Sequence, residues 1–175
     1  LIIWSKKNKQ SFLYISDIIS MSIPIGLFFG RIANFINGEL YGRITTSKLG
    51  IIFPNTNGLP RHPSQLYEAF FEGIVLFLIL WFVRKKKPFD GFILGLYPIG
   101  YGVFRFFIEY FREPDADLGY RIATVQDAPT YLNVSWGNIS TGQILCLLMI
   151  AAGIGILIAL SIRQRILKKR AQIKH

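Results

Sequence analysis

Apolar residues collect in four long stretches of the chain, and polar, turn-forming residues separate these stretches. A helix needs about 20 apolar residues to cross the hydrocarbon core of a bilayer. The last stretch contains no charged residue and lacks the polar positions at helical period that a soluble amphipathic helix would show. The pattern therefore predicts four membrane-spanning helices, at residues 18–36, 66–83, 92–111 and 144–162.

The composition supports the same interpretation. Hydrophobic residues make up 51% of the 175 positions and charged residues 17%, with a mean hydropathy of +0.39, whereas a soluble domain has about 25% charged residues. No internal repeat, low-complexity tract or second domain is evident in the sequence. We expect an all-α integral membrane protein, a polytopic helical bundle that forms a single domain over residues 1–175.

The formal net charge of +10 would suggest a nucleic-acid partner in a soluble protein. Here, however, 13 of the 20 lysines and arginines fall on one side of the membrane if the four spans alternate in direction. They are Lys6, Lys7, Lys9, Arg84, Lys85, Lys86, Lys87, Arg163, Arg165, Lys168, Lys169, Arg170 and Lys174. Because positively charged loops stay in the cytoplasm, we expect both termini to be cytoplasmic and the loops at 38–65 and 112–143 to lie outside. The excess of positive charge then reflects membrane topology, and we expect no nucleic-acid partner.

Three ionisable residues inside the predicted spans are candidates for function: Arg31, Arg105 and Glu109. Such residues usually face a bundle interior or a wet cavity and mark a functional site. Tyr101, Arg105 and Glu109 lie at i, i+4 and i+8, so they share one stripe of a helix. The sequence leaves open whether Arg105 and Glu109 form only a structural pair. Arg31 has no acidic residue three or four positions away, so its counter-charge must come from another helix or from a ligand.

A polar segment follows Arg31 at the end of the first span. Asn34 and Asn37 continue its helix face, and a guanidinium beside two amides suits the phosphate and hydroxyl groups of a lipid headgroup. Gly38 and Gly42 come next and would allow sharp turns. A simple helix end at Asn37 and Gly38 explains those two residues, but it does not explain an arginine in hydrocarbon.

A second cluster surrounds His62, where an outer loop meets the second span. A histidine near carboxylates can act as a general base close to neutral pH, but a histidine before Pro63 also fits the start of a helix. Ser64 lacks the G-x-S-x-G surroundings of a hydrolase nucleophile. One outer histidine and scattered acids match no metal-ligand spacing, so we expect neither a metal nor another cofactor. The only cysteine, Cys146, is expected to pack inside the bundle.

Three segments resemble the sequence blocks of the bacterial prolipoprotein diacylglyceryl transferases, in the same order and spacing. They are GRIANFINGELYGR at 30–43, RHPSQLYEAFFEG at 61–73 and GLYPIGYGVFRFFIEYFREPDADLG at 95–119. The resemblance implies transfer of the diacylglyceryl group from phosphatidylglycerol to the thiol of the lipobox cysteine of a preprolipoprotein, with release of glycerol phosphate. It also implies a place among the lipids of the bacterial inner membrane, with the active site facing the outer leaflet.

The resemblance further implies roles for individual residues. Arg31 would contact the lipid phosphate, and His62 or Glu39 would be the base. The substrate-binding set is then Arg31, Asn34, Asn37, Gly42 and Arg105, and the catalytic set is His62, Glu39, Tyr101, Arg105 and Glu109. Family members begin with further spans that contain a His-Gly-Gly motif, so the chain is similar to the C-terminal portion of a family member.

A second interpretation comes from another class of protein. The same charges could line a pathway in a transporter, or a site in a non-catalytic lipid-binding subunit for anionic headgroups. Transporters usually contain paired repeats with matching broken helices, and no such symmetry is evident in this sequence. A purely structural role is not expected either, because Arg31, Arg105 and Glu109 cannot cancel one another's charge.

Overall fold

A computed structural model describes residues 2–54, 56–113, 120–122, 124, 129–132 and 135–173, so part of the predicted loop at 112–143 lies outside the described residues. Helices account for most of the described residues, as the sequence pattern predicts. The helical elements are α1 (Ile2–Lys7), α2 (Phe12–Ile36), α3 (Ser64–Glu68), the π-helix η1 (Ala69–Val75), α4 (Leu76–Val83), the 3-10 helix η2 (Arg84–Lys86), α5 (Phe92–Ile108) and α6 (Thr141–Ile173).

Three helical segments are long and apolar enough to cross a membrane: α2, Ser64–Lys86, and Thr141–Gln172 within α6. Each contains one predicted span and extends beyond it, because the helix continues past the apolar stretch. α5 coincides with most of the predicted span 92–111 but ends at Ile108, after 17 residues. The backbone N–H of Phe111 bonds the Ile108 carbonyl at 2.9 Å, three residues back, so the helix closes in a tight turn before the loop begins.

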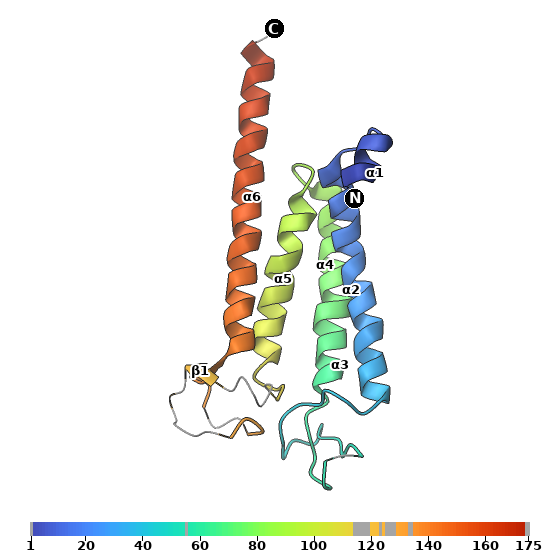
Figure 1. Ribbon diagram of the computed structural model, residues 1–175, viewed down its shortest axis with the longest axis vertical. Helices are drawn as coiled ribbons and strands as arrows, with labels where there is room; N and C mark the ends of the chain where they lie inside the picture. Colours follow the sequence, from blue (N-terminus) through green and yellow to red (C-terminus); the bar gives the residue numbers. More distant parts are fainter. Residues whose placement is uncertain are drawn as a thin grey trace.

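The helices run side by side, with α5 between α6 and the segment formed by α3, η1 and α4 (Figure 1). The described residues of the loops at 37–63 and 109–140 gather at the bottom of Figure 1, and we call this the loop end. The opposite end carries α1, the turn at 84–91 and the last turns of α6, which extend well past the other helices. We call it the basic end, because Arg84–Lys86 and the cations of α6 lie there.

Small residues bring α5 and α6 into close contact. A Cβ on Gly153 would lie 2.7 Å from the carbonyl oxygen of Gly95, and one on Gly102 would lie 2.9 Å from the carbonyl oxygen of Cys146. Backbones approach this closely only where no side chain intervenes, and small residues are typical of helix contacts in membranes. Cys146 is 3% exposed, which confirms it as a packing residue.

Few apolar side chains are buried inside the bundle. Leu76, Leu80 and Ile93 form its centre and are at most 1% exposed, whereas large apolar residues such as Phe82 and Ile158 are exposed. In the most apolar part of α6, only 11% of the residues are buried. A soluble protein rarely exposes apolar faces of this extent. The described residues thus belong to a mostly helical membrane protein.

At the basic end, Asp17 of α2 holds the start of α5. Its buried carboxylate accepts hydrogen bonds from the backbone N–H groups of Gly91 (3.0 Å) and Leu94 (2.9 Å), which satisfies free donors at a helix start. Lys87 Nζ lies 3.0 Å from the same carboxylate and 2.8 Å from Asp90. Burial lowers the pKa of Lys87, but the bonds and charges of Asp90 and Asp17 outweigh burial, so the pKa is raised.

The loop end contains a feature that the all-α prediction lacks. β1 (Tyr120–Ile122) pairs with β2 (Ile139–Ser140) as an antiparallel two-stranded ladder. Strands this short leave no hydrophobic periodicity to detect in a sequence. Because β2 leads directly into α6, the ladder helps to fix where that helix begins.

Candidate functional site

An arginine near the end of α2 forms the first part of a polar site at the loop end. Arg31 Nε lies 2.5 Å from Oε2 of Glu68, the last residue of α3. Of the two sources of counter-charge that the sequence leaves open for Arg31, another helix or a ligand, the structure shows another helix. Glu68 is only 1% exposed, so the pair lies in surroundings where an unpaired charge would be costly.

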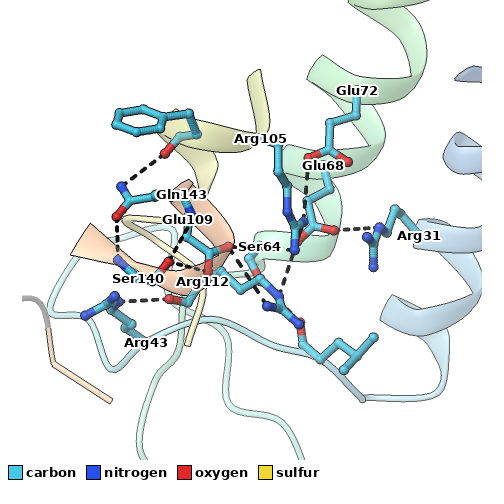
Figure 2. A network of polar contacts seen from close by, with 12 residues as sticks. Arg31, Arg43, Ser64, Glu68, Glu72, Arg105, Glu109, Arg112, Ser140 and Gln143 are labelled. Carbon is cyan, nitrogen blue, oxygen red and sulfur yellow. Dashed lines mark hydrogen bonds and ion pairs between the residues drawn. The ribbon is translucent and has the colours of Figure 1, made fainter. Parts of the chain in front are cut away.

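Arg105 on α5 lies among three carboxylates. Its Nη1 is 2.9 Å from Glu68 Oε1 and 3.6 Å from Glu72 Oε1, while its Nη2 is 3.7 Å from Glu109 Oε2. Figure 2 shows the guanidinium reaching across to Glu68 and Glu72 from the neighbouring helix. The pair with Glu109 that the sequence suggests is present, but Glu68 is the closer partner.

Arg112, just after α5, completes the set. Its Nε lies 4.0 Å from Glu68 Oε1, and its Nη1 lies 3.9 Å from Glu109 Oε2. We define the ion network as Arg31, Arg105, Arg112, Glu68, Glu72 and Glu109 (Figure 2). Its cations and anions are equal in number, so its formal charge is zero. Arg31, Arg105 and Glu109 alone would carry a net positive charge, and the balance is completed by Glu68 and Glu72 from the second span together with Arg112.

Glu72 stands on the π-helical turn η1, which begins directly after Glu68. The side chain is 0% exposed, and neither carboxylate oxygen has a hydrogen-bond partner among the described residues. π-helical turns within α-helices occur frequently at functional sites, and an unsatisfied buried polar group calls for an explanation. The position of Glu72 beside Arg105 explains why the carboxylate is tolerated there, because the guanidinium provides a counter-charge.

The start of α6 contacts the ion network through Glu109. Ser140 Oγ donates a 3.0 Å hydrogen bond to Glu109 Oε1. Ser140 and Gln143 also form a capping box, in which the N–H of Gln143 donates to Ser140 Oγ (3.2 Å) and the N–H of Ser140 donates to Gln143 Oε1 (2.9 Å). A Cβ on Gly142 would collide with the Glu109 carboxylate. The free N–H groups and the dipole of the helix start stabilise a carboxylate at this position.

One of the two predicted amides after Arg31 contacts Glu39. Asn37 ends α2 at an exposed position, and its Nδ2 donates to Glu39 Oε1 at 3.3 Å. Asn34 is half-buried, and its backbone carbonyl accepts the N–H of Glu39 at 3.1 Å. The structure thus brings three of the predicted residues, Asn34, Asn37 and Glu39, together at the end of α2.

Gly38 and Gly42 of this segment meet different structural requirements for a glycine. Gly38 adopts φ +67°, which confirms the predicted turn. Gly42, in contrast, does not adopt a positive φ. Instead, a Cβ on Gly42 would collide with the carbonyl oxygen of Phe111 and with His62. Gly42 is therefore the point where the loop after α2 crosses the chain that leaves α5.

His62 lies in the loop before α3, with its ring among aromatic side chains. Its Nδ1 is 3.2 Å from the hydroxyl of Tyr67, and its ring lies edge-on to Phe111. Burial lowers the pKa of His62, so the ring is neutral at pH 7 and able to accept a proton. Its backbone also bonds Gly42 and Arg43. The geometry is compatible with both roles that the sequence suggests, a base and the start of a helix.

Tyr101 lies one helical turn from Arg105, toward the basic end of α5. Its ring stacks on that of Tyr97 with centroids 6.0 Å apart, and it packs against the centre formed by Leu76, Leu80 and Ile93. The three residues predicted to share one face of the helix at i, i+4 and i+8 therefore have different surroundings. Arg105 and Glu109 belong to the ion network, and Tyr101 borders it.

Sequence reasoning misses three members of the network, Glu68, Glu72 and Arg112, as site residues. A usable signal exists for the two acids, because they lie at i and i+4 at the start of an otherwise apolar span, while Arg31 lacks a partner on its own helix. Which span supplies that partner depends on how the helices pack, and the sequence pattern does not specify this.

Arg43 is a second residue that the sequence leaves unassigned. It is buried, although it is an arginine. Its Nε donates to the carbonyl of Arg112 at 2.8 Å, and its Nη1 donates to the carbonyl of Leu132 at 2.8 Å and to the hydroxyl of Tyr120. These bonds attach the loop after α2 to the loop after α5, and they fix the backbone from which Arg112 reaches the network.

The arrangement is suited to binding an anion next to hydrocarbon. Among the described residues, Arg31 pairs with a carboxylate through Nε, which leaves its two Nη groups for a ligand, and guanidinium groups bind phosphate through parallel N–H donors. An apolar cleft of about 340 Å³ lies between α5 and the segment formed by α3 and η1. Its walls are Tyr67, Phe71, Phe104, Phe107, Ile108 and Phe111.

Comparison with known proteins gives consistent matches. The family described as prolipoprotein diacylglyceryl transferase matches residues 1–159. The phosphatidylglycerol–prolipoprotein diacylglyceryl transferase of Treponema denticola is 51% identical over 97% of this chain and 60% of its own length. Proteins of the same name from Treponema pallidum and Chlorobaculum tepidum are 50% and 55% identical, over 91% and 90% of this chain. The chain spans 50% to 60% of the length of these curated relatives.

Proposed function

Because the chain belongs to the prolipoprotein diacylglyceryl transferase family, we propose that it carries the lipid-phosphate site of such an enzyme. The reaction moves the diacylglyceryl group of phosphatidylglycerol onto the thiol of the lipobox cysteine of a preprolipoprotein and releases glycerol phosphate. The observation that carries the proposal is the convergence of Arg31, Arg105 and Arg112 on Glu68 at one end of apolar helices. The names of the relatives include both substrates, phosphatidylglycerol and prolipoprotein.

The chemistry requires positively charged donors directed at the phosphate. The sulfur forms a bond to the glyceryl carbon that carries the phosphate, and the bond from that carbon to the phosphate oxygen breaks. The electron pair goes to the phosphate, which gains negative charge, while the thiol proton passes to a base. Guanidinium groups fixed in low-dielectric surroundings stabilise the charge as it develops. Arg31 and Arg105 supply these groups, and Glu68 fixes the orientation of both.

The predicted residues take their roles around this centre. Arg31 and Arg105 bind the phosphate, and His62 or Glu39 accepts the thiol proton. Asn34, Asn37 and Gly42 form the rest of the headgroup site, and Tyr101 and Glu109 support Arg105. The contact between Asn37 and Glu39, and the crossing of the chain at Gly42, support an assignment of these loop residues to one functional unit.

The aromatic cleft beside the network receives an acyl chain of the lipid. Its volume of about 340 Å³ and its apolar walls suit hydrocarbon. Tyr67 lines the cleft and also contacts His62. The cleft therefore borders the candidate base His62 through Tyr67.

The membrane arrangement follows from the helices and the charges. α5 is the third of the four spans in chain order, although its 17 residues cover only about 26 Å at 1.5 Å per residue, because it packs between longer helices. Both termini and the basic end are cytoplasmic, and the loop end faces the outer leaflet of a bacterial inner membrane. In this arrangement residues 1–175 form one integral membrane domain.

The test is a transfer assay with the intact protein, phosphatidylglycerol and a lipobox peptide, read as the mass gain of one diacylglyceryl group on the cysteine. Arg31→Ala should abolish the mass gain while the protein still inserts into membranes, because a phosphate ligand is lost. Lys48→Ala removes an exposed cation of the same loop end and serves as the matched control. Wild-type transfer by Arg31→Ala would refute the proposal.

A further inference from the structure

A groove at the basic end lies far from the ion network and is not part of the proposed reaction. It has a volume of about 590 Å³ and lies between α6 and the segment that leads into α5, including Pro88 and Phe89. Figure 1 shows that α6 and the start of α5 border this end, opposite the loops that carry the candidate active site.

The wall that α6 contributes changes from apolar to cationic along the helix. Leu157 and Ile158 line one part of the groove, Ser161 comes one turn later, and Arg165 and Lys168 line the end nearest the C-terminus. The spacing of three, four and seven residues puts these side chains on one face of α6. The groove therefore offers hydrocarbon contacts at one end and two positive charges at the other.

The length of α6 places the cations at the level of lipid headgroups. Its 33 residues extend about 50 Å at 1.5 Å per residue, and the hydrocarbon core is about 30 Å thick. Because the apolar stretch ends at Ile162, the turns that carry Arg165 and Lys168 lie outside the hydrocarbon. Leu157 and Ile158 lie within it.

The two cations of the groove are not neutralised by the protein. Lys87 at the same end is paired with Asp17 and Asp90, whereas no ion pair joins Arg165 or Lys168 to any acid in the part of the chain that the structure describes. No acidic residue lines the groove. A ligand with negative charge next to an apolar tail complements both parts of the site.

We propose that this groove binds one anionic glycerophospholipid of the cytoplasmic leaflet, with its phosphate on Arg165 and Lys168 and an acyl chain against Phe92 and Leu157. Basic pockets between helices on the cytoplasmic side are suited to anionic lipid headgroups. The lipid acts as a fixed structural partner between α5 and α6 and not as the substrate, because the site lies at the end opposite the ion network.

Native mass spectrometry of the intact protein tests this site without relying on activity. The probe is dioleoyl phosphatidic acid, added to detergent-purified protein, with dioleoyl phosphatidylcholine as the neutral comparison. We expect Arg165→Gln/Lys168→Gln to weaken retention of the first phosphatidic acid about tenfold, because two headgroup contacts are lost. The control Lys169→Gln/Arg170→Gln removes the same charge from residues that do not line the groove, and it should retain lipid like the wild type.

A second variant tests whether lipid retention depends on the shape of the groove as well as on its charge. Ser161→Trp fills the groove with no change in charge and should also reduce retention of phosphatidic acid. Transfer to the lipobox peptide should continue in all these variants, so the outcome is independent of the proposed function. Equal retention by the groove variants and the wild type, equal losses in the control, or equal binding of phosphatidylcholine would overturn the proposal. So would a wild-type protein that retains no lipid because another protein segment covers the groove.

Discussion

The two ends of the bundle use charge in opposite ways. At the loop end, Arg31 and Arg105 are drawn into the helices and paired with Glu68, which is almost fully buried. At the basic end, Arg165 and Lys168 are exposed and have no acidic partner among the described residues. Exposed positive charge that flanks a span is enough to set topology. Charge that is buried and paired within a span is the kind expected at a functional site.

The largest expected effect is on the loop end, from Glu68→Gln. This change leaves Arg31 and Arg105 without their shared counter-charge, and breaking a buried pair costs about 3–5 kcal/mol. We expect a corresponding drop in the free energy of unfolding, measured by thermal or denaturant unfolding in detergent. Asp90→Asn is the control at the basic end, where the carboxylate is 41% exposed and the loss should stay under about 1 kcal/mol. Equal losses of unfolding free energy in Glu68→Gln and Asp90→Asn would show that charge is not used differently at the two ends.

The second prediction concerns the assignment of chemistry to the loop end. If His62 is the base, His62→Gln should slow transfer by about 100-fold. Because burial lowers the pKa of His62, the wild-type rate should be constant at neutral pH and fall only as the pH drops through this lowered value, where the ring becomes protonated. The variant should lack this acidic decline. An unchanged rate and pH profile would leave His62 as a structural residue of the loop that leads into α3.

The smallest of the three effects is expected at the basic end, from Asp17→Ala. This change leaves the N–H groups of Gly91 and Leu94 without their acceptor, which should cost about 2 kcal/mol of stability. Transfer by the folded variant should remain close to wild type, because Asp17 supports the helix start and does not contact the ion network. A tenfold loss of transfer in protein that is still folded would show that the two ends are coupled.

Much of the helical framework is predictable because the length of an apolar stretch is a local property. Predicted spans at 18–36, 66–83 and 144–162 all lie inside observed helices. The end of α5 is different, because Phe111 and Arg112 form hydrogen bonds and a bridge that involve the loop after α2. A contact between segments this far apart in the chain has no local signal, so the sequence placed the end of the helix too late.

The candidate site likewise has features that the sequence predicts and features that depend on tertiary packing. The need of Arg31 for a distant counter-charge is predictable from its apolar surroundings, but the identity of Glu68 requires the packing of α2 against α3. The role of Gly42 is likewise invisible in the sequence, because it depends on the crossing of two loops. Residue types along the chain indicate which ionisable groups a site could contain. Tertiary contacts determine which of these groups pair with one another.

The most direct measurement is the rate of diacylglyceryl transfer by Arg31→Lys, together with its melting temperature. Lysine keeps the positive charge beside Glu68 but lacks the planar fork that binds phosphate. If the network exists to bind lipid phosphate, the melting temperature stays near that of the wild type, while transfer falls about 10- to 100-fold with the loss of a charged hydrogen bond. Wild-type transfer by Arg31→Lys would contradict this account and leave Arg31 as a structural ion-pair partner.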